Sequence, residues 1–193
     1  MSAPPGGFYS EERWDNWIDR IREEDLDPED EGSARLLLNL QDDAAIAVAK
    51  ILKARESGEL DESGAMDELV TIRDVVLAPV EFDDDEKSML VDGVQTSLVP
   101  VFVAAEEFLT NGPAEDAAVE PYVTAAADAE ADDPETALGF CAQAGTLIID
   151  GKTFDVSIAE ELEYGLVAEW INGLDSLQRA LEDPEVVEED DGE

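Results

Sequence analysis

Apolar residues in the first part of the chain recur with the period of an α-helix. After a suitable N-cap at Ser10, they fall at i, i+3, i+4 and i+7, which predicts an amphipathic helix with Trp14, Trp17, Ile18 and Ile21 on one face. The acidic residues 23–32 interrupt this pattern. A longer apolar stripe then predicts a second helix from Ser33 to Gly58. The short link 58–64 leads to a third helix that stops at Pro79, and so short a link favours an antiparallel pair.

The same period continues through the middle of the chain. Asp83 to Asp85 open a predicted fourth helix that ends at Asn111-Gly112. Pro100 falls inside it, and an unrelieved internal proline costs about 3 kcal/mol, so this helix should kink or split there. Pro121 and Pro134 instead stand where the first position of two further helices would accept proline.

The stretch 146–156 has two interpretations. Asp150-Gly151 between β-branched residues is typical of a hairpin turn. It is equally consistent with a helix end followed by an extended loop. We favour the helix end, because the apolar stripe that begins after Pro134 enters this stretch in phase.

The last predicted helix begins at Ser157, which forms a capping box with Glu160. Its apolar positions keep the helical period to residue 181, which predicts one helix of roughly 24 residues. Gly165 and Gly173 would lie on one face of it, marking either close packing inside the bundle or a homodimer seam.

These patterns together predict an all-α fold, a single-domain bundle of six or seven helices over residues 10–182. Residues 1–9 are Pro- and Gly-rich and form a predicted flexible N-terminal segment. Residues 183–193 form a predicted acidic, disordered tail.

The charge composition points to a particular solvent. The chain has 51 acidic and 11 basic residues, a formal net charge of −40, and only four lysines against seven arginines. Such self-repulsion opposes compaction in dilute buffer, whereas molar salt shortens the Debye length to about 3 Å. Lysine-poor, aspartate-rich surfaces resemble those of cytoplasmic proteins from halophiles that accumulate salt. We therefore expect a halophilic, cytoplasmic protein.

Several kinds of partner become unfavourable. Nucleic-acid binding needs clustered Lys and Arg, and the densest cluster, Lys50, Lys53 and Arg55, sits where a helix C-terminus favours cations. The longest apolar run, 98–105, has eight residues where a membrane span needs about 20. The first twelve residues do not have the pattern of a secretory signal. The expected partner is therefore a protein or a second copy of the chain, with no nucleic acid and no membrane.

The catalytic repertoire is narrow. The chain has no histidine, which excludes Ser-His-Asp and Cys-His sets, and no glycine-rich phosphate loop. Cys141, its one cysteine, lies on an apolar stripe and is interpreted as a core residue. No cofactor is expected. We lean towards a protein that is not an enzyme.

Paired carboxylates are the one abundant chemical group. All-α, magnesium-dependent nucleotide pyrophosphohydrolases hold Mg²⁺ with acidic pairs at i and i+3 on facing helices. About 13 such pairs are expected by chance at this acidic content, so a metal site here is only an alternative. The weak candidates are Glu59 with Glu62, Glu81 with Asp84, and Glu160 with Glu163.

Aromatic residues and glycines are the candidates for interaction with a partner. Trp14 and Trp17 could anchor a partner, but we favour their packing onto the bundle. Trp170, together with Gly165 and Gly173, marks the face of the last helix where a neighbour would approach.

Several segments carry a family resemblance. FYSEERWDNWIDRI, ARLLLNLQDDAAIAVAKI, DGVQTSLV, ALGFCAQAGTLIIDG and AEELEYGLVAEWINGLDSLQ resemble the archaeal domain-of-unknown-function 2150 family, found in haloarchaea, over residues 8–188. That family has no assigned activity, and Pro100 is the least expected feature of the match. The resemblance implies a cytoplasm of high salt. The leading hypothesis is a non-enzymatic interaction or regulatory protein; the alternative is a Mg-dependent nucleotide-binding or pyrophosphohydrolase-like protein.

Overall fold

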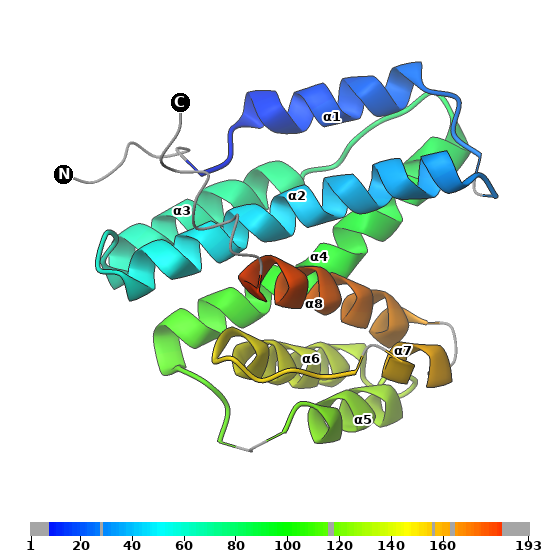
Figure 1. Cartoon of the computed structure of the whole chain (residues 1–193). Coiled ribbons are helices and arrows are strands. Elements are labelled where there is room, and N and C mark those ends of the chain that lie inside the picture. The colour runs from blue at the N-terminus through cyan, green and yellow to red at the C-terminus, as the bar shows by residue number, and fades with distance from the viewer. Residues whose placement is uncertain (1–7, 28, 116–117, 156, 163–164, 183–193) are drawn as a thin grey trace.

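A computed structural model describes residues 8–27, 29–115, 118–155, 157–162 and 165–182. Within those ranges the chain forms eight helices and no strand (Figure 1). Seven of the helices have ten or more residues, so the predicted all-α bundle is confirmed. The helices are α1 (Glu11–Glu23), α2 (Glu31–Glu56), α3 (Glu62–Val76), α4 (Asp85–Asn111), α5 (Glu120–Ala129), α6 (Pro134–Ile149), α7 (Ser157–Glu161) and α8 (Leu166–Glu182).

The predicted boundaries of the domain are untested. Of the segment 1–9, the structure describes Phe8 and Tyr9, both of which pack against the core. The acidic segment 183–193 lies outside the described residues.

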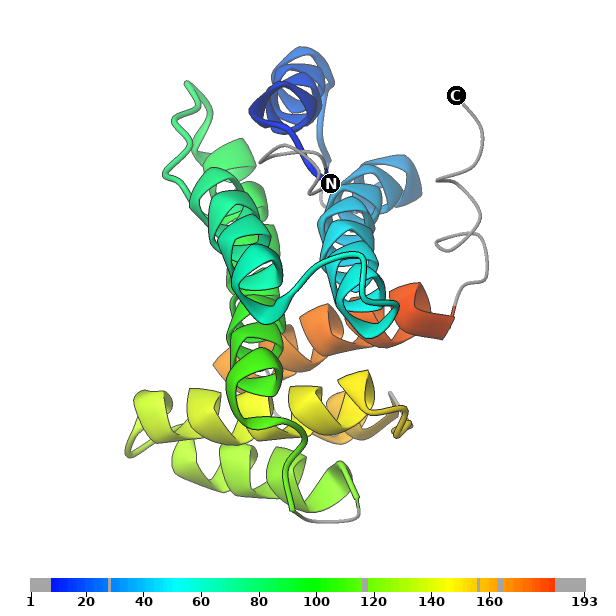
Figure 2. The ribbon, with the colours of Figure 1, turned by 90° about the vertical axis from the view of Figure 1, so that its left-hand side faces the viewer.

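Helix α4 is the central element and contacts α2, α3, α6 and α8. Figure 1 shows α1, α2 and α3 gathered towards one end of α4, and α5, α6, α7 and α8 towards the other. The side view in Figure 2 shows α4 running between these two groups. Helices α2 and α3 lie antiparallel, as the short link predicts, and Gly58 ends α2 with a φ of 83°. A main hydrophobic core results, with contributions from every long helix, and a small second cluster joins Ala45 and Ala49 to Ala180.

Acidic side chains begin most of the long helices. Asp30 accepts from the backbone N–H of Ser33 at 3.1 Å, and Asp61 accepts from Gly64 at 2.7 Å. An aspartate in this position satisfies a free N–H group and complements the helix dipole. Because Asp30 is the cap, α2 begins two residues before the Ser33 that the pattern suggested.

Pro100 neither splits α4 nor ends it. The helix continues for 27 residues through this position, so of the two expected outcomes, a kink or a split, the split is wrong. Pro100 and its neighbours Val101 and Phe102 are buried in the bundle. Burial of such side chains contributes roughly 1.5–3 kcal/mol each, enough to offset the lost backbone hydrogen bond.

The stretch 146–156 ends a helix, as we favoured. Helix α6 stops at Ile149, Gly151 adopts a φ of 100°, and residues 152–155 have no regular secondary structure. Val156 lies outside the described residues.

The single last helix was predicted wrongly, because α7 and α8 are separate. Glu130, at the end of α5, accepts from the backbone N–H of Leu166 at 2.8 Å and of Val167 at 3.3 Å. In one continuous helix, these two N–H groups would instead donate to the backbone carbonyls of residues 162 and 163. The carboxylate of Glu130, 36 residues before Leu166 in the sequence, therefore caps α8 as a separate helix. The apolar period of the sequence continues across the break between α7 and α8.

Helix α4 is also long and apolar enough to cross a membrane by length and composition, with a mean hydropathy of 1.4 in an 18-residue window. Half of that window is buried inside the bundle. A core helix meets the same criterion, and the contacts of α4 with four neighbours fit that role.

Candidate functional site

The first four acidic candidates lie around two connections. Glu59 is exposed in the link between α2 and α3, and Glu62 is exposed at the first position of α3. Asp84 is the N-cap of α4 and accepts from the backbone N–H of Glu86 at 2.9 Å. Its partner Glu81 lies in the loop before α4, where its backbone carbonyl accepts from an arginine of α1. A capping role accounts for Asp84 without a metal.

The third acidic pair is only partly described. Glu160 lies exposed on the short helix α7, while Glu163 falls outside the described residues. Across the ranges that the structure describes, no three Asp, Glu or Cys side chains come close enough together to hold a metal ion.

Both tryptophans of α1 face the bundle. Trp14 is 4% exposed in the core. Trp17 donates from Nε1 to Asp43 Oδ2 at 2.9 Å, and Arg13 donates from Nε to the same oxygen at 2.8 Å. Asp43 therefore ties α1 onto α2 through partners 26 and 30 residues away. Burial raises the pKa of the neighbouring Tyr9 above its ordinary value, and the Asp43 carboxylate adds to the effect.

The two glycines of the last segment have different surroundings. Gly173 is buried where α8 crosses α4, and a methyl group built on it would overlap the carbonyl oxygen of Ser97. Gly165 precedes α8, and a methyl group there would overlap the carboxylate of Glu130. Gly165 is therefore not on a helix face with Gly173. Within this chain, Gly173 allows α8 to pack closely against α4. Trp170 is buried, with 6% of its surface exposed.

A second close crossing joins α4 and α6. A methyl group on Gly145 would overlap the side chain of Ala104 and lie 3.0 Å from Leu174 Cδ2. Small residues thus let α4, the central helix, pack closely against both α6 and α8.

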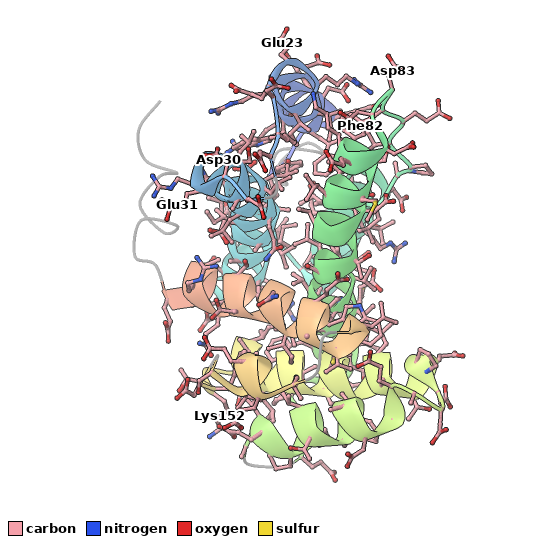
Figure 3. The ribbon with its side chains drawn as sticks, turned by 90° about the vertical axis from the view of Figure 1, so that its right-hand side faces the viewer. Glu23, Asp30, Glu31, Phe82, Asp83 and Lys152 are labelled. Carbon is pink, nitrogen blue, oxygen red and sulfur yellow. The ribbon has the colours of Figure 1, made fainter. Side chains whose placement is uncertain are left out.

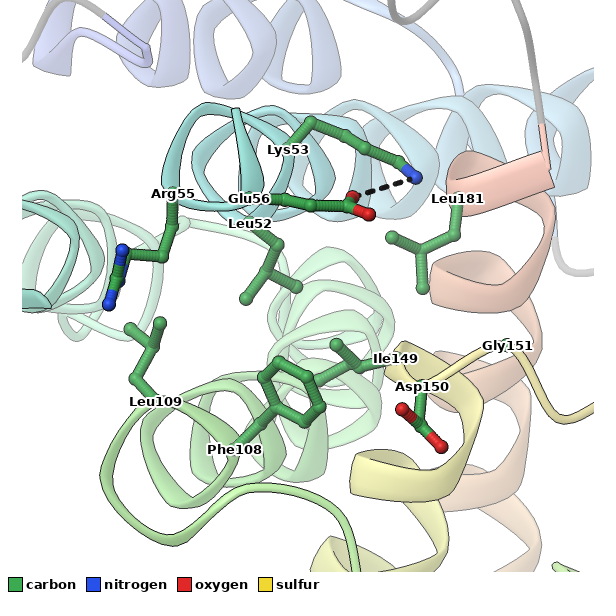
Figure 4. Close-up of a pocket in the computed structure, with 10 residues that line it drawn as sticks. All are labelled: Leu52, Lys53, Arg55, Glu56, Phe108, Leu109, Ile149, Asp150, Gly151 and Leu181. Atoms are coloured by element: carbon green, nitrogen blue, oxygen red, sulfur yellow. Dashed lines mark hydrogen bonds and ion pairs between the residues drawn. The ribbon is translucent and has the colours of Figure 1, made fainter. Parts of the chain in front are cut away.

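One hollow lies where the C-terminal ends of α2, α4, α6 and α8 meet. Its volume is about 510 Å³, within the range of small-ligand and side-chain pockets. We name it the four-helix groove (Figure 4), and its lining is Leu52, Lys53, Arg55, Glu56, Phe108, Leu109, Ile149, Asp150, Gly151 and Leu181.

The floor of the four-helix groove is apolar and partly buried. Phe108, Leu109, Ile149 and Leu181 are all partly buried, and Leu52 is 6% exposed. Apolar side chains from α4, α6 and α8 that remain partly accessible in one concave place form a surface that a partner can cover.

The edge of the groove carries charges of both signs. Lys53 pairs with Glu56 at 3.5 Å, across a contact drawn in Figure 4. Arg55 lies at the opposite edge, exposed, and its side chain makes no ion pair or hydrogen bond with the described part of the chain. Both cations also complement the C-terminal end of α2. Asp150 adds an exposed carboxylate at the end of α6.

Sequence reasoning identified Lys53 and Arg55 only as a basic cluster and missed the groove. A local signal existed for part of it: Phe108 and Leu109, and likewise Ile148 and Ile149, are adjacent apolar pairs in a last helical turn. A helix cannot bury two consecutive large residues equally well on one face. The convergence of the four ends is a tertiary feature and had no local signal.

Several acidic side chains lie around the N-terminal ends of α2 and α4. Figure 3 shows Glu23, Asp30, Glu31 and Asp83 around the N-terminal ends of α2 and α4, and Lys152 towards the other end. Two shallower hollows beside α1 and the loop before α4, of about 710 and 630 Å³, share Arg22 and Glu81 in their lining.

Cys141 is a core residue. It is fully buried on α6. Burial raises the pKa of its thiol to about 12, and the charge of Glu130 adds to the effect. A thiol so far from its thiolate form is a poor nucleophile.

The fold and the four-helix groove thus define an all-α helical bundle with an amphipathic hollow at one end. Residues 7–190 match the profile of a family described as an uncharacterized protein conserved in archaea (DUF2150). The chain belongs to this family. No curated protein and no solved structure matches it.

Proposed function

We propose that this protein is a non-enzymatic interaction protein of a salt-rich archaeal cytoplasm, which binds a short segment of a partner protein in the four-helix groove. The observation that carries the proposal is the groove itself, where partly buried apolar side chains of α4, α6 and α8 adjoin an arginine whose side chain is unpaired among the described residues. The tryptophans considered from the sequence do not support it, because Trp14 and Trp170 are buried.

The groove selects its ligand by two features. Its apolar floor accommodates one or two large apolar anchor side chains, because a cavity of about 510 Å³ exceeds the volume of a single side chain. Arg55 can hold a carboxylate through two parallel hydrogen bonds, which adds specificity in direction. The expected ligand is therefore a segment with adjacent apolar residues flanked by acidic ones.

The affinity of this binding depends on direct contacts in the groove rather than on the net charge of the whole protein. A net charge of −40 repels acidic partners at low ionic strength. At molar salt the Debye length falls to about 3 Å, so that repulsion vanishes beyond direct contact while the hydrophobic contribution persists.

The experiment compares capture by groove variants and matched controls. Tagged protein is used at about 2 M KCl to capture partners from native lysate, since that salt keeps the Debye length near 3 Å or below. Leu109→Asp and Arg55→Glu should each lose a stoichiometric partner that the wild type captures. The matched controls are Leu38→Asp and Arg35→Glu, because both residues are exposed on α2 outside the groove lining.

Two results would contradict the proposal. One is a partner retained equally by groove variants and controls. The other is a folded wild type that captures no partner at all, with circular dichroism confirming that each variant remains helical.

The Mg²⁺-dependent alternative gains no support from the described residues, since no three of their acidic side chains converge. Calorimetry at high KCl discriminates between the two functions. Saturable Mg²⁺ binding that is lost in a Glu160→Gln, Glu163→Gln double variant would favour the alternative.

A further inference from the structure

The four-helix groove lies beside the end of α8. Leu181 lines it, and α8 ends at Glu182, so the chain leaves the described bundle at the groove. Residues 183–193 follow directly, with the sequence DPEVVEEDDGE. Figure 4 shows Lys53 extending towards Leu181.

The composition of this segment matches the ligand expected for the groove. Val186 and Val187 are its only large apolar residues, and Glu185 and Glu188 flank them directly. The valines suit the apolar floor, and a flanking carboxylate suits Arg55. The groove lining has two cations, Lys53 and Arg55. Lys53 pairs with Glu56, which leaves Arg55 as the one without a partner among the described residues.

We propose that residues 183–193 dock in the four-helix groove and regulate it by competing with the partner segment. This inference rests on the proposed function, since it names the regulator of the same groove.

The reach of the chain permits this docking. Val186 is five residues beyond Leu181, a span of up to roughly 17 Å when extended. A segment tethered so closely has an effective concentration in the millimolar range, so weak contacts suffice to occupy the groove.

The test uses full-length protein and a fluorescent peptide of residues 183–193 as the probe. A Val186→Asp, Val187→Asp variant should leave the groove open, whereas the wild type fills its own groove. If the groove is nine-tenths occupied, the wild type binds the probe about tenfold more weakly than the variant. An Asp190→Asn, Asp191→Asn variant is the matched control, because it changes two acidic residues and keeps the valines; it should bind as the wild type does.

A spin label provides a direct readout of position. Cys141 is buried, so a label attached at Asp191→Cys reacts selectively. We expect it to broaden the methyl resonances of Leu52 and Ile149 in the groove, and Arg55→Glu should reduce that broadening.

The outcomes separate the two proposals. Equal probe affinity for the wild type and the valine variant overturns the regulatory inference, as does a spin label that leaves the groove methyls sharp. If a partner is still captured through the groove in that case, the proposed function stands without its regulator. If neither the probe nor any partner depends on the groove, both proposals fall.

Discussion

Replacing Gly173 by alanine tests the closest contact in the bundle. The added Cβ would lie 2.6 Å from the carbonyl carbon of Ser97 and 3.4 Å from its Cα, and would overlap the carbonyl oxygen. The obstacle is the backbone of α4, which cannot rotate away as a side chain can. Carbon atoms in contact prefer about 3.5–4.0 Å, and the carbonyl oxygen is nearer still, so α8 and α4 must separate by more than about 1 Å.

The expected loss of stability has two opposing parts. Overpacking costs about 1–3 kcal/mol, and a rigid backbone obstacle places this site at the upper end. Alanine in a helix gains about 1 kcal/mol over glycine. The net destabilisation is therefore about 2 kcal/mol, which lowers Tm by roughly 4–8 °C for a chain of this size.

A glycine in open surroundings is the matched control. Gly139 is exposed in the middle of α6, and a methyl group there would have no atom within 4 Å. Gly139→Ala should raise Tm by roughly 2–4 °C, because only the helix propensity changes. Thermal and urea unfolding at a fixed KCl concentration, followed by circular dichroism, measure both variants. Gly173→Ala with a Tm equal to or above that of the wild type would refute the close approach of α8 to Ser97.

Three further predictions concern salt, the attachment of α1 and the buried thiol. Dialysis from about 2 M to 0.1 M KCl should abolish the helical circular dichroism signal, because screening is lost; an unchanged spectrum refutes the halophilic interpretation. Asp43→Ala should cost about 2 kcal/mol and expose the amides of residues 11–23 to hydrogen exchange, whereas Asp42→Ala, which removes a more exposed carboxylate from its pair with Arg179, should cost under about 1 kcal/mol; equal losses contradict this. The raised pKa of Cys141, about 12, leaves little thiolate at pH 8, so Ellman's reagent should react only as the protein unfolds; a rapid reaction of the native protein is the contrary result.

The sequence predicts what depends on residues within a helical turn or two of one another. Ser10 caps α1, Gly58 ends α2, and Pro134 opens α6, each as expected from local patterns. Features that depend on distant residues had no such signal. Asp43 receives its partners from another helix, and Glu130 interrupts a helical period that continues without a break in the sequence.

The candidate site was less predictable than the fold for the same physical reason. The basic cluster at the end of α2 was visible, but its neighbours in the groove come from α4, α6 and α8. The residues considered first for interaction, such as Trp14, carry apolar surface that the bundle itself buries. A periodic apolar stripe indicates which residues face the core of the fold. It does not indicate which of them remain partly exposed once the helices have packed.

The close crossings of α4 determine where the groove lies. Phe108 is four residues beyond Ala104 on α4, and Ile149 is four residues beyond Gly145 on α6, so each lies one turn past the same contact. Helices that touch through small residues diverge on either side of the contact. The large side chains of the next turn therefore face a widening gap, which leaves them only partly buried. A methyl group at Gly145 would alter stability and the groove together, whereas a change at Arg55 leaves the crossings untouched.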